Sequence, residues 1–86
     1  MYKLRLSKNA QKDLDRLQGN IWQRVREALA ELSDNPRPQG YKKLRGGTDT
    51  YRIRSGDYRV IYDIDDSPQT ITVLRVKHRR EVYREL

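Results

Sequence analysis

The chain of 86 residues is long enough for one domain, residues 1–86, whose thin core leaves little room for a deep internal active site. Its 19 Lys and Arg residues against 12 Asp and Glu give a net charge of +7, which favours an anionic partner without identifying it. The absence of cysteine excludes disulfides and thiolate metal sites, no apolar run approaches the ~20 residues that span a bilayer, and the N-terminus lacks a signal-peptide core, so we expect a cytoplasmic protein without membrane contact.

The first elements predicted are a strand and a helix. Residues 2–6 alternate apolar and basic side chains, which is typical of a short, half-buried strand. Ser7 is a favourable N-cap, so a helix should follow it and stop at Gly19. The apolar stripe of this helix is Ala10, Leu14 and Leu17.

A second helix is predicted to start at Asn20, with Gln23 in the capping-box position. It should end at Asn35, because the residue before Pro36 is disfavoured in the helical region. Two helices joined so tightly should form an αα-hairpin. The expected buried stripe is Ile21, Val25, Ala28, Leu29 and Leu32.

The remaining residues predict a loop and a three-stranded meander. Residues 37–50 are rich in proline, glycine and basic residues and read as a loop, after which the apolar period becomes two. Strands are predicted over residues 51–54, 58–65 and 70–78, with a type II′ turn at Gly56-Asp57. The order is β-α-α-β-β-β, an α+β fold in which an antiparallel sheet carries the two-helix hairpin on one face.

The parity of the hairpin gathers arginines on the face that the helices leave open. Arg52, Arg54 and Arg59 alternate with core residues, and the two-residue turn places Arg54 directly opposite Arg59, which is destabilising for like charges. Such a face could simply be solvated. Basic residues of the loop and of the tail favour a phosphate-binding groove instead, since the planar arginine fork binds two phosphate oxygens. The further cations assigned to this groove are Lys42, Lys43, Arg45, Lys77 and Arg80.

The end of the last strand and the tail carry the side chains with proton chemistry, His78 and Tyr83, and we expect both on the same face as the arginines. His78 is the single histidine, and it is either a structural residue or a proton donor whose charge an anionic ligand would favour. Tyr83 is either a core aromatic or a platform for base stacking. No metal-ligand spacing and no Ser-His-Asp arrangement is present, so no metal or cofactor is expected. RNA supplies its own nucleophile, because its 2′-hydroxyl can attack the adjacent phosphate.

Four segments carry a familiar pattern: Leu44-Arg45-Gly46, Tyr51 to Arg54, Gly56 to Tyr62 and Val76 to Arg84. Together with the order of the elements, they resemble the RelE group of the RelE/ParE toxin superfamily over essentially the whole chain. The resemblance implies the toxin of a toxin–antitoxin pair that cleaves messenger RNA in the ribosomal decoding site. It also implies an acidic, RelB-like antitoxin as the partner.

The resemblance also implies roles for single residues. Arg59 would stabilise the phosphate in the transition state, Arg79 would act at the leaving group, and Tyr83 would stack on or orient the nucleotide. Arg52 and Arg54 stand where the family often has lysine. Because arginine keeps its proton, we expect them to stabilise charge only, which leaves proton transfer to His78 or Tyr83.

Two other functions remain open from the residues alone. A ParE-like toxin would bind DNA gyrase and do no RNA chemistry, although the basic His-Arg tail favours the RNA-cleaving branch. A catalytically inactive nucleic-acid-binding module is the third interpretation. Degradation of mRNA on expression, as opposed to stalled replication, would separate the two kinds of toxin.

Overall fold

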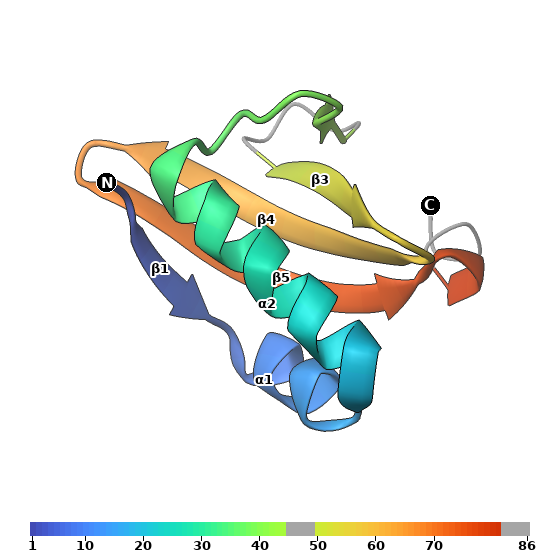
Figure 1. Ribbon diagram of the computed structural model, residues 1–86. Coiled ribbons are helices and arrows are strands. Elements are labelled where there is room, and N and C mark those ends of the chain that lie inside the picture. The colour runs from blue at the N-terminus through green and yellow to red at the C-terminus, as the bar shows by residue number, and fades with distance from the viewer. Residues whose placement is uncertain (45–49, 82–86) are drawn as a thin grey trace.

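The computed structural model of the chain describes residues 1–44 and 50–81 and contains one five-stranded mixed sheet with two helices (Figure 1). Helical residues 79–81 follow the last strand. None of the described helices is long and apolar enough to cross a membrane. The elements are β1 (Lys3–Leu6), α1 (Lys8–Asp15), α2 (Gly19–Asp34), β2 (Lys42–Lys43), β3 (Thr50–Ser55), β4 (Tyr58–Asp66) and β5 (Gln69–His78).

The strand order β1-β5-β4-β3-β2 confirms the predicted α+β fold but not a purely antiparallel sheet. β1 runs parallel to β5, pairing Lys3 with Thr70 through Leu6 with Val73, while the other neighbours are antiparallel. Parallel strands need a long connection, which the helices after β1 begin. Alternation within residues 2–6 reports only that they form a strand, because strand direction depends on a partner far along the chain.

The core lies between α2 and one face of the sheet, which α2 crosses in Figure 1. Ile21, which was expected in the buried stripe of α2, is 43% exposed instead, because it lies in the first turn of the helix and the buried residues of α2 begin one turn later, at Val25. The buried apolar residues are Ala10, Leu14, Val25, Leu29, Leu32, Tyr51, Ile53, Val60, Tyr62, Ile64, Ile71, Val73 and Val76.

The junction between the helices differs from the predicted one. Ser7 is the N-cap of α1, as predicted, and accepts a hydrogen bond from Ala10 N at 3.0 Å. The helix already ends at Asp15, and Gly19, predicted as its stop, is instead the first residue of α2, with φ of +57°. A left-handed φ at this position favours glycine, so the glycine marks the start of one helix and not the end of the other.

Two features complete the sheet. Gly56 has φ of +60° whereas Asp57 does not have positive φ, as the predicted type II′ turn requires. Within the predicted loop, Lys42 and Lys43 form β2 by pairing with Arg52 and Tyr51. A two-residue strand is too short to show an alternating pattern in the sequence, so only its pairing with β3 identifies it.

Candidate nucleic-acid interface

A row of three cations crosses the open face of the sheet. Arg59 on β4 is paired directly with Arg54 on β3 and with Lys77 on β5, and directly paired residues share a face. Their chain neighbours Ile53, Val60 and Val76 belong to the core, so the row lies on the face away from α2. Arg59 and Lys77 are only 7% and 5% exposed. Bringing like charges together in this way is unfavourable for folding and favourable for binding an anion.

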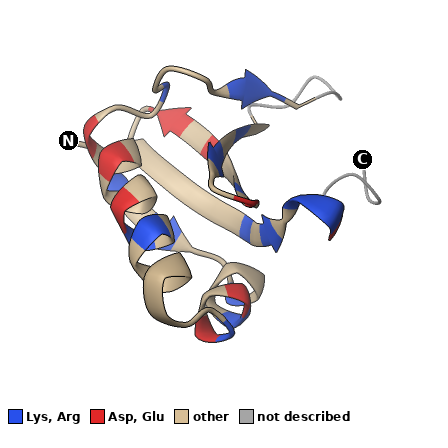
Figure 2. Cartoon of the chain, turned by 45° about the vertical axis from the view of Figure 1, so that its right-hand side comes forward, with Lys and Arg blue, Asp and Glu red and all other residues tan. Residues whose placement is uncertain are grey.

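A second row extends the positive surface towards the edge of the sheet. Lys42 on β2 pairs with Arg52 on β3, which in turn pairs with Ile61. Figure 2 shows Lys and Arg in β2, at the end of β5 and in the residues that follow it, while acidic residues occupy the far end of β4. The open face is therefore positive at the end that carries Gly56 and negative at the other.

The guanidinium of Arg59 is held in one orientation. Its Nη1 donates to the carbonyl oxygens of Gly56 at 3.2 Å and Tyr58 at 3.1 Å. Both hydrogen bonds use the same nitrogen. Within the described part of the chain the Nε and Nη2 edge has no acceptor, so it is left for another one. That edge is one of the two forks with which arginine binds an oxyanion through two parallel hydrogen bonds.

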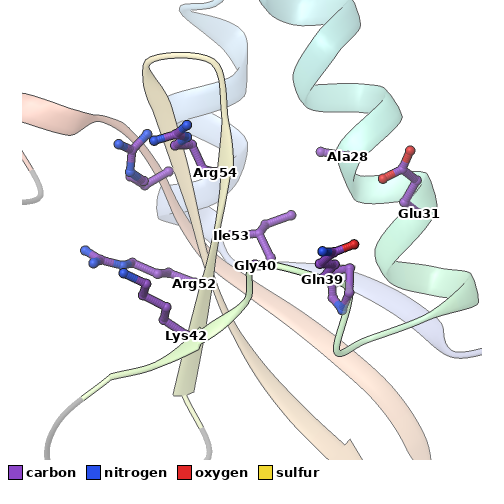
Figure 3. Close-up of a pocket in the computed structure, with 10 residues that line it drawn as sticks. Ala28, Glu31, Gln39, Gly40, Lys42, Arg52, Ile53 and Arg54 are labelled. Carbon is purple, nitrogen blue, oxygen red and sulfur yellow. The ribbon is translucent and has the colours of Figure 1, made fainter.

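A cavity of about 410 Å³ opens beside these cations at the edge of β3. In Figure 3 the side chains of Lys42 and Arg52 extend together on one side of β3, whereas Ile53 points towards α2. Glu31 of α2 is the one carboxylate among its lining residues, so four cations dominate the charge. The lining residues are Ala28, Glu31, Pro38, Gln39, Gly40, Lys42, Arg52, Ile53, Arg54 and Arg59.

A polar cluster on the other side of β3 fixes the segment that leads into β2. Asp66 accepts from the hydroxyl of Tyr2 at 2.6 Å and from Arg37 at 3.1 and 3.3 Å. The hydrogen bonds from Arg37, and then the one from Tyr2, lower the pKa of Asp66. Arg37 also lies 5.9 Å from the ring centre of Tyr51. Tyr62 donates to Pro36 O at 2.8 Å, and burial raises the pKa of Tyr62. These contacts hold the segment that positions Lys42.

Comparison with known proteins shows the family to which this chain belongs. The family model described as ParE toxin of type II toxin-antitoxin system, parDE, matches residues 4–83. Toxin RelG of Mycobacterium tuberculosis is 38% identical over 84 residues, which cover 96% of this chain and 97% of RelG. The mRNA interferase toxin RelE of Escherichia coli is 33% identical over 88 residues, which cover 98% of this chain and 92% of RelE. The chain belongs to the RelE-type toxins.

Solved structures of RelE-type toxins share the fold. The toxin of the toxin–antitoxin complex RelBE2 from M. tuberculosis matches with a TM-score of 0.79 at 37% identity, over 90% of this chain and 96% of that chain. The curated relatives are named RelE or RelG, which favours the RelE-type interpretation over the gyrase-binding one that the sequence left open.

The site residues predicted for a RelE-type toxin do not all lie on one face. Arg52, Arg54, Arg59, Lys77 and Lys42 gather on the open face. Lys43 pairs with Tyr51 and so lies towards the helix side, and Arg79 and Arg80 are exposed just beyond β5. Arg45 and Tyr83 lie outside the described residues.

His78 does not join the cationic row of this RelE-type fold. It pairs with Tyr58 on the helix side of the sheet, with the two rings edge to face at 5.4 Å, and both line a separate cavity of about 190 Å³ with Arg24. Its Nδ1 accepts from Arg80 N at 3.3 Å. The expectation that His78 shares a face with Arg59 is therefore wrong, because residues next to each other on a strand point to opposite faces and Lys77 occupies the open one. Its catalytic role stays a prediction.

Proposed function

We propose that this chain is the toxin of a type II toxin–antitoxin pair and an endoribonuclease that cleaves messenger RNA in the ribosomal decoding site. Arg59 carries the proposal: it lies buried between Arg54 and Lys77 in the row on the open face, and its Nε and Nη2 edge makes no hydrogen bond with the described residues. A buried charge held in one orientation stabilises an extra negative charge more strongly than a solvated one. The name mRNA interferase of the E. coli relative supports the same chemistry.

The reaction requires alignment and charge stabilisation. The 2′-hydroxyl oxygen bonds to the adjacent phosphorus and the bond to the 5′ oxygen breaks, which leaves a cyclic 2′,3′-phosphate and a 5′-hydroxyl. The attacking hydroxyl loses one proton and the leaving oxygen gains one. Arg59 would stabilise the pentacoordinate phosphate, and the surrounding cations Arg54, Arg52 and Lys42 would hold the flanking phosphates.

The leaving group and the protons need further residues. Arg79, whose amide donates to Asp57 O at 2.7 Å, follows directly on β5 and would act at the leaving oxygen, with Arg80 beside it. Lys77 is the lysine of the row beside Arg59, and lysine, unlike arginine, is a residue type that serves as a general acid or base. The candidates for proton transfer are therefore Lys77, His78 and Tyr83.

The proposed partner is an acidic antitoxin. Solved relatives are toxin–antitoxin complexes, and a chain with a net charge of +7 should attract an acidic segment. Such a segment would fold as it covers the open face.

Primer extension on mRNA from translating extracts tests the proposal. Wild type should produce new 5′ ends within coding sequence. Arg59→Ala should reduce them by about 10²–10³-fold while remaining folded. Arg26→Ala, which removes an exposed arginine of α2 outside both cavities, should behave as wild type. Uncleaved mRNA together with inhibition of gyrase supercoiling would replace this function with the ParE-like one.

A further inference from the structure

β5 contains one residue more than the part of β4 with which it pairs. Ile61 pairs with Arg75 and Tyr62 pairs with Val73, so Leu74 has no partner on β4. An extra residue of this kind is a β-bulge, and it exchanges the two faces for every side chain that follows.

The bulge decides which side chains reach the open face. Ile71 and Val73 are buried before it, and Val76 is buried after it, which a regular alternation would not allow. Without the extra residue Lys77 would point into the core and Val76 would lie on the open face. With it, Lys77 lies beside Arg59.

α1 holds the outer edge of β5 at the bulge, just beyond the point where pairing with β1 ends at Leu6 and Val73. The hydroxyl of Ser7 donates to Leu74 O at 2.9 Å. The carboxylate of Asp13 accepts from Val76 N at 2.9 Å and from Arg75 Nε and Nη2 at 2.9 and 3.1 Å. One side chain therefore binds both residues that follow the bulge.

Asp13 is unusual for an acidic residue because it is only 7% exposed. Carboxylates are rarely buried unless they are paired and hydrogen-bonded, and this one is both. Asp15, two residues on, is exposed, and its carboxylate accepts a hydrogen bond from Gln11 of its own helix. The burial of Asp13 is thus specific to its contact with β5.

We propose that Asp13 is a positioning residue for the RNA-binding face: it holds the bulge that places Lys77 beside Arg59 and sets the direction in which the chain leaves towards Arg79. This role rests on the proposed function for its consequence in catalysis, but the effect on the β5 register is independent of it. Asp13 acts through β5 and touches no substrate.

The test compares Asp13→Asn with the matched control Asp15→Asn. Asparagine still accepts from Val76 N but cannot pair with the charge of Arg75. We expect amide hydrogen exchange at residues 74–77 to become faster in Asp13→Asn alone, as measured by NMR. Displacement of reacting groups by about 1 Å can cost 10²-fold in rate, so cleavage per folded molecule should fall by about 10–100-fold in kcat with KM little changed.

The outcomes separate this role from a purely structural one. Folded Asp13→Asn with wild-type kcat and wild-type exchange at residues 74–77 would overturn the proposal, as would a loss of activity that only matches the loss of folded protein. If Asp13→Asn does not fold, Asp13→Glu takes its place, because it keeps the charge and shifts the acceptor by one methylene; a wild-type kcat there would also overturn the proposal. Failure of wild type itself to cleave mRNA would instead refute the proposed function, and the exchange measurement would still decide the role of Asp13.

Discussion

At the scale of single residues, the shape of the Arg59 side chain matters as well as its charge. Its Nη1 is already bonded to two carbonyl oxygens, so the opposite edge is the part that can bind phosphate. Lysine has no such fork. We expect Arg59→Lys to cleave mRNA more slowly than wild type, but faster than Arg59→Ala with its loss of about 10²–10³-fold. Single-turnover primer extension measures the three rates, and Arg26→Lys serves as the control.

Equal activity of Arg59→Lys and wild type would show that charge alone suffices at this position. The thermal midpoint of Arg59→Ala should stay near that of wild type. The substitution removes the hydrogen bonds of the guanidinium, but it also removes the repulsion of Arg59 by Arg54 and Lys77. A variant that unfolds would make Arg59 a structural residue.

The neighbouring pair Lys77 and His78 gives a second prediction at this scale, because the two side chains lie on opposite faces. Lys77→Gln should lower the cleavage rate about 10-fold or more, since it removes a charge next to Arg59. His78→Gln should lower the rate less than Lys77→Gln, because the His78 side chain lies on the face opposite Arg59. The rates are compared across pH in single turnover. A loss of about 10²-fold in His78→Gln, together with a lost pH inflection, would establish histidine as the proton carrier.

At the scale of elements, the docking of α1 on β5 should depend on pH. Burial opposes ionisation of Asp13, but hydrogen bonds from Arg75 and Val76 outweigh it and leave the pKa of Asp13 below its ordinary value. A carboxyl with a lowered folded-state pKa stabilises the fold above its unfolded pKa of about 3.9 and loses this contribution as the pH falls through the folded value.

We therefore expect the thermal midpoint of wild type to fall more steeply than that of Asp13→Asn between about pH 5 and pH 3. Asp66 also has a lowered pKa, but it is present in both proteins, so the difference between them isolates Asp13. Calorimetry at several pH values provides the comparison. Parallel curves would show that the Asp13–Arg75 ion pair contributes nothing measurable to the docking.

At the scale of the whole molecule, the net charge of +7 is distributed unevenly, and this should be visible in RNA binding. Each phosphate neutralised on a single strand contributes about −0.7 to the slope of log K against log salt. Lys42 is exposed on the open face, whereas Lys12 is exposed on α1. We expect Lys42→Ala to reduce the magnitude of the slope by about 0.7 and Lys12→Ala to leave it unchanged.

Filter binding or fluorescence anisotropy with a short single-stranded RNA across a series of salt concentrations measures these slopes. Equal reductions of the slope in both variants would mean that RNA binding depends only on the net charge of the protein. Antitoxin binding should also weaken with salt, though less steeply, because apolar burial is not screened.

Much of this protein follows from the sequence by itself. Period-two alternation, the N-cap at Ser7, the proline at position 36 and the Gly56-Asp57 turn act within a few residues, so the strands, the start of α1, the end of α2 and the Arg54–Arg59 pairing could all be predicted. The resemblance of its motifs to RelE-type toxins likewise uses only the order of residues.

Only the tertiary structure decided the direction of β1, the existence of β2 and the face on which Lys77 and His78 lie. Alternation predicts the face on which each side chain lies only while the pairing of the two strands is regular. The extra residue Leu74 breaks that regularity. The hydrogen bonds that hold this part of β5 come from Ser7, the N-cap of α1, and from Asp13 of α1, more than 60 positions earlier in the chain. No local pattern in β5 records those partners, because they meet the strand only once α1 has packed against its edge.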